Sequence, residues 1–118
     1  MSIFVALDSI DAGKADMNSL VPISKHAAET GGSRMGLTEG ETVSLNDLFL
    51  GMSVSSGNDA SMAVAEFIGG SEQNFVDMMN AKAISLGMFN THFVNPNGLP
   101  AKGQFTTARD MMLLARAY

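Results

Sequence analysis

Three successive segments between residues 44 and 87 each combine a helix-starting residue with an apolar face at helical spacing. The first segment begins at Ser44, three residues before Asp47, which is a variant of the capping box with Asp in place of Glu. Its apolar face consists of Leu45, Leu48, Phe49 and Met52. Because 118 residues leave room for one core only, these segments predict a single, mainly helical unit.

The two following segments are bounded by glycines. A second helix begins at Asn58 and ends at Gly69-Gly70, and a third is capped by Ser71 and stops at Gly87. The apolar face of the third helix consists of Phe75, Val76, Met79, Ala83 and Leu86.

The ends of the chain add further helices and a small β element. Helical spacing predicts a helix over residues 2–12, and a last helix opens at Thr107 with Asp110 three residues later. One side of this last helix carries Met111, Leu114, Ala115 and Tyr118. Residues 21–24 read as extended because Val21 precedes a proline, and residues 42–43 are predicted to pair with residues 21–23 as a small ribbon. Residues 25–30 form a short helical turn, residues 91–94 are extended, and residues 95–98 form a tight turn.

Composition excludes several classes of function. The chain has a net charge of −5 and only 7 Lys plus Arg, which argues against nucleic-acid binding. It has no Cys, which excludes a disulfide scaffold, a thiolate metal site and a cysteine nucleophile. Its longest unbroken run of aliphatic or aromatic residues, Ile3 to Leu7, is far too short to span a membrane or to serve as a signal peptide.

Two composition values are unusual. Charged residues make up only 16% of the chain, and Met occurs 10 times. Met fills irregular gaps, so the values fit a small Met-rich core. They fit equally well a surface that normally lies against something absent from the chain.

The residues that most often carry chemistry form no metal or phosphate motif. His26 and His92 lie 66 positions apart and outside any metal-binding pattern, so we interpret His26 as a surface residue and His92 as structural. The chain has no Gly-x-Ser-x-Gly motif and no phosphate-binding loop. Most acidic residues read as helix caps or as parts of solvated helix faces.

One tetrapeptide, Ser56-Gly57-Asn58-Asp59, lies between two strongly predicted helices. As an isolated pattern it is best read as an interhelical turn, in which Ser56 or Asn58 caps the helix and Asp59 complements the helix dipole. The wider context favours a functional interpretation.

The stretch Leu45 to Gly70, with this tetrapeptide inside it, resembles the second active-site motif of serine penicillin-binding proteins. The resemblance is greatest to the D-alanyl-D-alanine carboxypeptidase family of low-molecular-weight enzymes, and it covers nearly the whole chain. The other similar segments are Val21-Pro22-Ile23-Ser24, residues 40–44, Gly70-Ser71-Glu72, Phe75-Val76, residues 79–83, Leu86-Gly87-Met88, residues 90–99 and residues 107–111.

The resemblance implies the helical subdomain of a β-lactamase-like fold with a small β-hairpin element, spanning residues 1–118. It implies a serine-type hydrolase that cleaves the terminal D-Ala–D-Ala bond of peptidoglycan stem peptides through an acyl-enzyme and is acylated by penicillins. Ser56 would relay a proton to the leaving D-alanine nitrogen, and Asn58 would bind the amide carbonyl of the substrate. The resemblance implies no metal or cofactor, and it implies a periplasmic or cell-surface parent protein.

Two motifs of the family are absent. No Ser is followed by Lys at the third position, and Lys102-Gly103-Gln104 does not match the Lys-Thr-Gly motif. We therefore expect a fragment cut at both ends, with the nucleophile just upstream of Met1, and we expect the isolated chain to be inactive. We also expect self-association, such as a homodimer, through an exposed apolar face for which Phe4, Met52, Met62 and Met111 are candidates.

Two alternatives stay open. One is a related acyl-serine enzyme, such as a β-lactamase or a peptidoglycan endopeptidase. The other is a helical binding module that keeps the fold without the chemistry.

Overall fold

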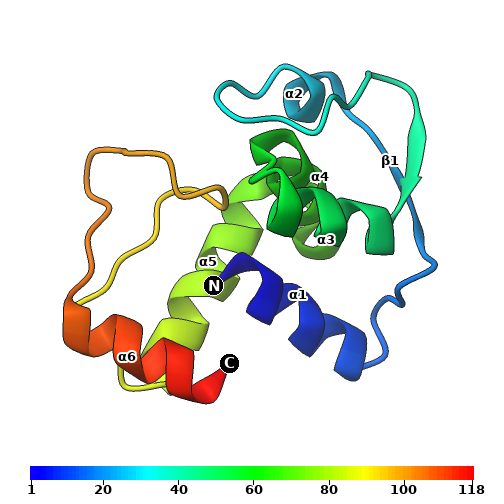
Figure 1. Ribbon diagram of the computed structural model, residues 1–118. Helices are drawn as coiled ribbons and strands as arrows, with labels where there is room; N and C mark the ends of the chain where they lie inside the picture. Colours follow the sequence, from blue (N-terminus) through cyan, green and yellow to red (C-terminus); the bar gives the residue numbers. More distant parts are fainter.

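The helix α4, which follows the Ser56-Gly57 turn, lies at the centre of the molecule (Figure 1). The computed structural model describes residues 1–118 and measures 39 × 31 × 24 Å. Its elements are α1 (Ser2–Asp11), β1 (Leu20–Pro22), α2 (Lys25–Ala28), β2 (Thr42–Ser44), α3 (Leu45–Val54), α4 (Asn58–Gly69), α5 (Glu72–Ser85) and α6 (Ala108–Ala117). The predicted mainly helical chain with a small β element is confirmed.

Side-chain caps start four of the helices. The hydroxyl of the N-cap residue accepts a hydrogen bond from the backbone N–H three residues later, at 3.0 to 3.2 Å. These residues are Ser24, Ser44, Ser71 and Thr107. Each such cap stabilises its helix by about 1 kcal/mol. The helix starts predicted at Ser44, Ser71 and Thr107 are therefore confirmed.

Small side chains on α4 allow its neighbours to pack closely around it. Ala60, Ala63 and Ala65 are almost completely buried. α1, α2, α3 and α5 all contact α4. At the corner between α4 and α5, a Cβ atom on Gly69 would lie 2.7 Å from the backbone nitrogen of Phe75, so only glycine fits there. Gly70 then ends α4 with a φ of 80°, in the left-handed region that glycine adopts without strain.

The predicted ribbon forms as an antiparallel pair of three-residue strands, with Val21 opposite Val43. The two strands are not joined by a tight turn. The connection between them contains α2 and a loop that returns across the start of α4, as Figure 1 shows in cyan. This connection brings residues 31–37 against the start of α4.

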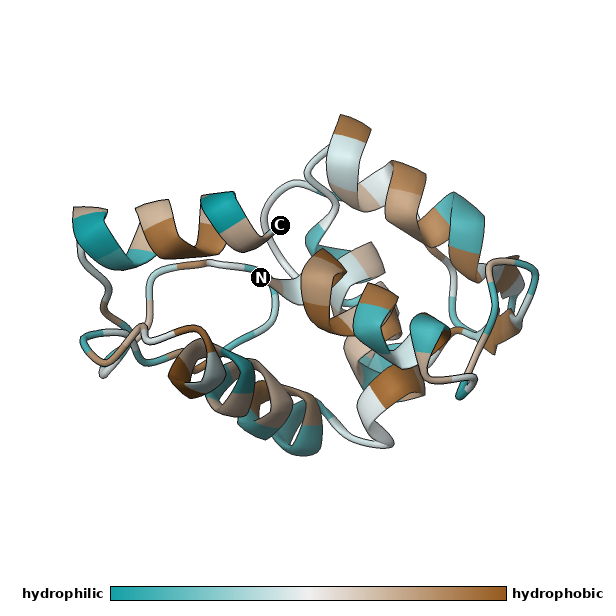
Figure 2. Ribbon diagram, turned by 90° about the horizontal axis from the view of Figure 1, so that it is seen from below, coloured by the Kyte–Doolittle hydropathy of each residue, from teal (hydrophilic) through white to brown (hydrophobic).

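Little of the predicted apolar side of α6 is covered in the structure. The face predicted from Met111, Leu114, Ala115 and Tyr118 is buried only at Leu114. The reason is that α6 packs on a cluster with only two other fully buried members, Ala83 and Met88. Hydrophobic residues therefore remain exposed on α6, next to the point marked C in Figure 2.

The four residues proposed for an exposed apolar face differ in how far they are exposed. Met111 is 44% exposed, whereas Met62 is 5% exposed and belongs to the main core, so the expectation for Met62 is wrong. Phe4 and Met52 are half-buried. No helix is long and apolar enough to cross a membrane.

Candidate active site

The turn between α3 and α4 is tight and strained at one residue. Ser56 has a φ of 54°, and it is the only non-glycine residue in the chain with a positive φ. Such a conformation costs on the order of 1–3 kcal/mol and occurs preferentially at functional sites. The backbone N–H of Gly57 donates to the carbonyl of Gly51 at 3.0 Å and closes the turn. A Cβ atom on Gly57 would lie 3.1 Å from the Asp59 carboxylate and 3.3 Å from the Met35 nitrogen, so the packing there favours glycine.

Asp59, in the first turn of α4, is completely buried and holds the neighbouring loop in place. Its Oδ1 atom accepts hydrogen bonds from the N–H groups of Met35 at 3.0 Å and Ala60 at 2.9 Å. Its Oδ2 atom accepts from Gly36 at 3.1 Å and Leu37 at 3.0 Å. Burial raises the pKa of Asp59, but these four hydrogen bonds outweigh it and leave the pKa below its ordinary value.

Asn58 is held by the same loop. Its backbone N–H donates to the carbonyl of Ser33 at 2.8 Å, and its Nδ2 atom donates to the carbonyl of Gly31 at 3.1 Å. Gly32 lies directly against the amide, because a Cβ atom there would be 2.5 Å from Nδ2. The side chain is 7% exposed, so its amide is fixed in one orientation at the edge of the cleft.

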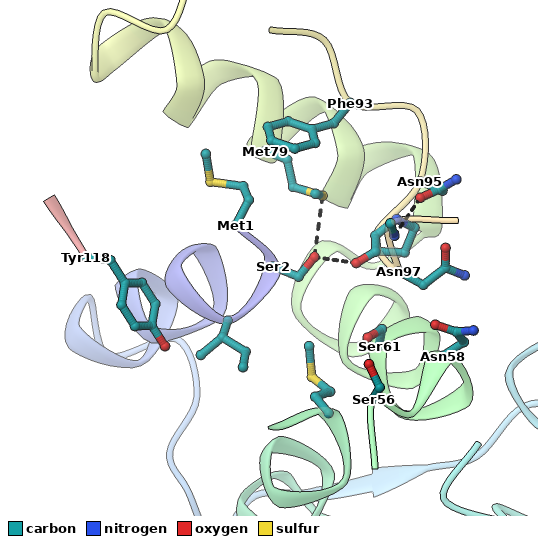
Figure 3. Close-up of a pocket in the computed structure, with 14 residues that line it drawn as sticks. Met1, Ser2, Ser56, Asn58, Ser61, Met79, Phe93, Asn95, Asn97 and Tyr118 are labelled. Atoms are coloured by element: carbon teal, nitrogen blue, oxygen red, sulfur yellow. Dashed lines mark hydrogen bonds between the residues drawn. The ribbon is translucent and has the colours of Figure 1, made fainter. Parts of the chain in front are cut away.

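A cleft of about 330 Å³ lies beside this turn (Figure 3). One wall carries the polar side chains of Ser56, Asn58 and Ser61, from the turn and the first two turns of α4. The other lining residues come from α1, α3, α5, the 93–98 segment and the last residue: Met1, Ser2, Ile3, Met52, Met79, Phe93, Asn95, Pro96, Asn97, Gly98 and Tyr118.

The 95–98 turn forms the opposite wall of the cleft and is fixed by side chains from outside it. Gln104 accepts hydrogen bonds from the N–H groups of Val94 and Asn95, and Asn80 makes two hydrogen bonds to the backbone of Phe93. The Ser2 hydroxyl donates to the Pro96 carbonyl at 2.5 Å. The predicted tight turn is confirmed, since the Asn95 side chain accepts from the Gly98 N–H at 2.8 Å.

The structure tests one part of the interhelical-turn interpretation, the capping roles of Ser56 and Asn58. The N-cap of α4 is Gly57, and no side chain caps the helix there. The capping roles considered for Ser56 and Asn58 are therefore wrong, and both side chains line the cleft. The predicted site residues are thus brought together at one place.

Several residues of this region were not found from the sequence. The sequence indicates Asp59 only as a complement to the helix dipole, and its burial follows from the fold. Ser61, Asn80 and Gln104 carried no signal that distinguishes them from other polar residues.

The histidines lie outside the cleft. His26 is exposed and pairs with Glu72 at 3.2 Å, which confirms its interpretation as a surface residue. His92 is also exposed, and its backbone forms a bridge with Phe105. No group of three or more His, Asp or Glu side chains could hold a metal ion.

Two crystal structures superpose closely on this chain. The first is the D-alanyl-D-alanine carboxypeptidase DacD from Francisella tularensis, with a TM-score of 0.94 and 53% identity over 99% of this chain and 28% of that one. The second is penicillin binding protein 6B from Escherichia coli, with a TM-score of 0.94 and 38% identity over 98% of this chain and 38% of that one. The fold is therefore that of the penicillin-binding proteins.

The sequence comparisons define the family within this class. The profile of the D-alanyl-D-alanine carboxypeptidase family matches residues 1–118. DacF from Bacillus subtilis (strain 168) is 44% identical over 116 residues, which are 98% of this chain and 30% of the relative. DacC from Escherichia coli (strain K12) is 41% identical over 123 residues, or 99% of this chain and 31% of the relative.

The chain belongs to the D-alanyl-D-alanine carboxypeptidase family, as its motifs predicted. It spans less than a third of the length of these two relatives.

Proposed function

We propose that residues 1–118 form the helical subdomain of a serine-type D-alanyl-D-alanine carboxypeptidase, with Ser56-Gly57-Asn58 as the second motif of its active site. The complete enzyme hydrolyses the terminal D-Ala–D-Ala bond of peptidoglycan stem peptides through an acyl-enzyme. One observation carries the proposal. The side chains of Ser56 and Asn58 line one cleft, and neither of them caps α4.

Ser56 is suited to proton transfer. In the proposed reaction, the serine of a Ser-x-x-Lys motif, which this chain does not contain, attacks the carbonyl carbon of the bond to the terminal D-alanine. The C–N bond breaks, and the leaving nitrogen takes up a proton. A hydroxyl both donates and accepts, so Ser56 can give this proton to the nitrogen and take one from the lysine. Water then hydrolyses the ester and regenerates the serine.

Asn58 is suited to hold the substrate. A carboxamide nitrogen has two N–H groups, and the carbonyl of Gly31 occupies one of them. The other N–H is left to donate to the amide carbonyl of the stem peptide. Because the amide is neutral, it binds this carbonyl without adding a charge to the site.

The same arrangement would accept penicillins, which acylate the same serine. The steps above require no metal ion or cofactor. The complete protein works in the periplasm or at the cell surface, where its substrate peptidoglycan is found. The E. coli relative of known structure is itself called a penicillin binding protein, which supports this assignment.

A chimera tests the proposal directly. Residues 1–118 replace the matching segment of B. subtilis DacF, whose remaining sequence supplies the rest of a carboxypeptidase. The chimera is expected to release D-alanine from a D-Ala–D-Ala peptide. Ser56→Ala should lower kcat by about 10²-fold or more, the usual scale for a proton-transfer group. Asn58→Ala should also impair turnover.

Ser55→Ala is the matched control, because the Ser55 hydroxyl donates to the Gly51 carbonyl at 2.8 Å and does not line the cleft. It should leave kcat unchanged. If Ser56→Ala and Asn58→Ala lower the melting temperature but keep kcat, both residues are structural and the proposal is wrong. If the chimera hydrolyses penicillin but no D-Ala–D-Ala peptide, the β-lactamase alternative is correct.

A further inference from the structure

A second hydroxyl shares the wall of the cleft with Ser56. Ser61 lies on α4 one turn after Asn58, and its backbone N–H donates to the Gly57 carbonyl in the regular helical pattern. The residue is 8% exposed and lines the cleft together with Ser56 and Asn58. Figure 3 shows Ser61 and Ser56 next to each other on the same wall, below the 95–97 segment.

The Ser61 hydroxyl lacks a hydrogen bond that the hydroxyls of two other serines near helix ends make. The hydroxyls of Ser9 and Ser55 each donate to the carbonyl four residues earlier, at 3.3 and 2.8 Å. Ser61 makes no such bond, although the Gly57 carbonyl is within reach of its backbone. No buried side-chain atom in the chain lacks a hydrogen-bond partner, so the Ser61 hydroxyl must open onto the cleft.

In the proposed reaction the lysine donates to one lone pair of the Ser56 oxygen, and a second donor can bind the other lone pair. The backbone conformation of Ser56 is fixed by the turn, but a hydroxyl hydrogen rotates freely unless a neighbouring group orients it. No side chain or backbone atom of the chain hydrogen-bonds the Ser56 hydroxyl, which opens onto the cleft. A group that donates to the Ser56 oxygen would leave its hydrogen free to point at the substrate.

We propose that Ser61 is a positioning residue of the active site: its hydroxyl donates a hydrogen bond through one water molecule to Ser56, and so directs the Ser56 proton toward the leaving nitrogen. This proposal rests on the proton-relay role of Ser56 proposed above. Ser61 itself touches no reacting atom, and its effect on the rate passes through Ser56.

The DacF chimera provides the test, with Ser9→Ala as the matched control. Ser9 is also a serine buried on a helix, but its hydroxyl is bonded to its own helix and lies away from this cleft. Ser61→Ala is expected to lower kcat for D-alanine release about 10-fold, a part of the effect of the relay group itself, with KM and melting temperature unchanged. Ser9→Ala should keep the kcat of the chimera.

A double-mutant cycle shows whether Ser61 acts through Ser56. Adding Ser61→Ala to Ser56→Ala should cause no further loss of kcat, because the group that Ser61 orients is already absent. A 10-fold loss in both backgrounds would overturn the proposal, as would an unchanged kcat in Ser61→Ala while Ser56→Ala is impaired. If Ser56→Ala leaves kcat unchanged, Ser56 does not relay the proton. The proposal for Ser61 is then wrong as well, because it depends on that role.

Discussion

The carboxylate of Asp59 accepts a hydrogen bond of 3.0 Å from the backbone N–H of Leu37, 22 positions earlier in the chain. With the bonds from Met35 and Gly36, this contact fixes the 31–37 loop against the first turn of α4. Asn58 is the neighbour of Asp59 and donates to the same loop at Gly31. The orientation of the Asn58 amide in the cleft therefore depends on a carboxylate that does not itself line the cleft.

Replacement of Asp59 should destabilise the chain strongly. Asp59→Asn removes one acceptor oxygen and places an NH₂ group against backbone N–H donors. We expect a loss of about 3 kcal/mol in the free energy of unfolding, since hydrogen bonds to a buried charged group contribute about 1.5–3 kcal/mol each. Urea denaturation measures the loss. Asp47→Asn, at an exposed position in the first turn of α3, is the control and should cost less than about 1 kcal/mol. Equal losses in the two variants would contradict the role of Asp59.

The contribution of Asp59 should depend on pH. Its pKa in the folded chain lies below its ordinary value, so the ionised form is favoured by folding. The resulting stability is fully present above the ordinary pKa of about 3.9 and is lost as the pH falls through the lowered pKa. The difference in unfolding free energy between the unsubstituted chain and Asp59→Asn should therefore shrink below about pH 4. Urea midpoints of both proteins from pH 6 downward check this, and a constant difference would show that Asp59 is not the titrating group.

Gly32 should be required for the position of Asn58. Gly32→Ala places a Cβ atom 2.5 Å from the Asn58 Nδ2 atom, at a φ of 79°. We expect reduced stability and, in the DacF chimera, a lower kcat/KM for D-alanine release. Gly13→Ala is the control, because Gly13 has the same φ of 79° and no atom within 4 Å of the added Cβ. Gly13→Ala should lower the free energy of unfolding by about 1 kcal/mol through backbone strain alone and leave kcat/KM unchanged. A Gly32→Ala chimera with normal kcat/KM would show that the Asn58 amide tolerates displacement.

The chain of 118 residues by itself should not react with penicillin. It contains neither a Ser-x-x-Lys motif nor a Lys-Thr-Gly motif, and catalytic groups that act as a unit are not replaced by the remaining member. Incubation with a fluorescent penicillin, followed by a denaturing gel, checks this prediction. A stoichiometric covalent band would show that a serine within the chain is the nucleophile.

The same chain should self-associate. Large apolar side chains are exposed on α3, on α6 and in the segments beside α6, and they include Leu50, Val54, Phe89, Phe105, Met111, Met112 and Tyr118. Exposed apolar patches above a few hundred Å² are uncommon on monomers. Sedimentation equilibrium over a hundredfold range of concentration measures the mass. A constant mass of one chain, without binding of a hydrophobic dye, would contradict this prediction and would mean that the chain is stable as a monomer with these side chains exposed.

The sequence by itself determined where the helices begin and end. Ser44, Ser71 and Thr107 cap their helices through bonds that reach only three residues along the chain, and the stops at Gly70 and Gly87 depend on the φ of one residue. Such interactions are local, so their residue types can be read directly from the order of amino acids. The family could also be recognised from the sequence, because its motifs are short segments of consecutive residues.

Only the tertiary structure determined which residues of separate elements come into contact. Three of the four hydrogen-bond partners of Asp59 lie 22 to 24 residues away, and the cleft joins Ser56 and Ser61 to the distant 95–98 turn. The same holds for α6, where helical spacing places four residues along one side of the helix and packing covers only Leu114. A periodic pattern shows which residues share one side of a helix. Whether that side is buried, and which groups meet across a cleft, depends on how separate helices pack against one another, which no local pattern encodes.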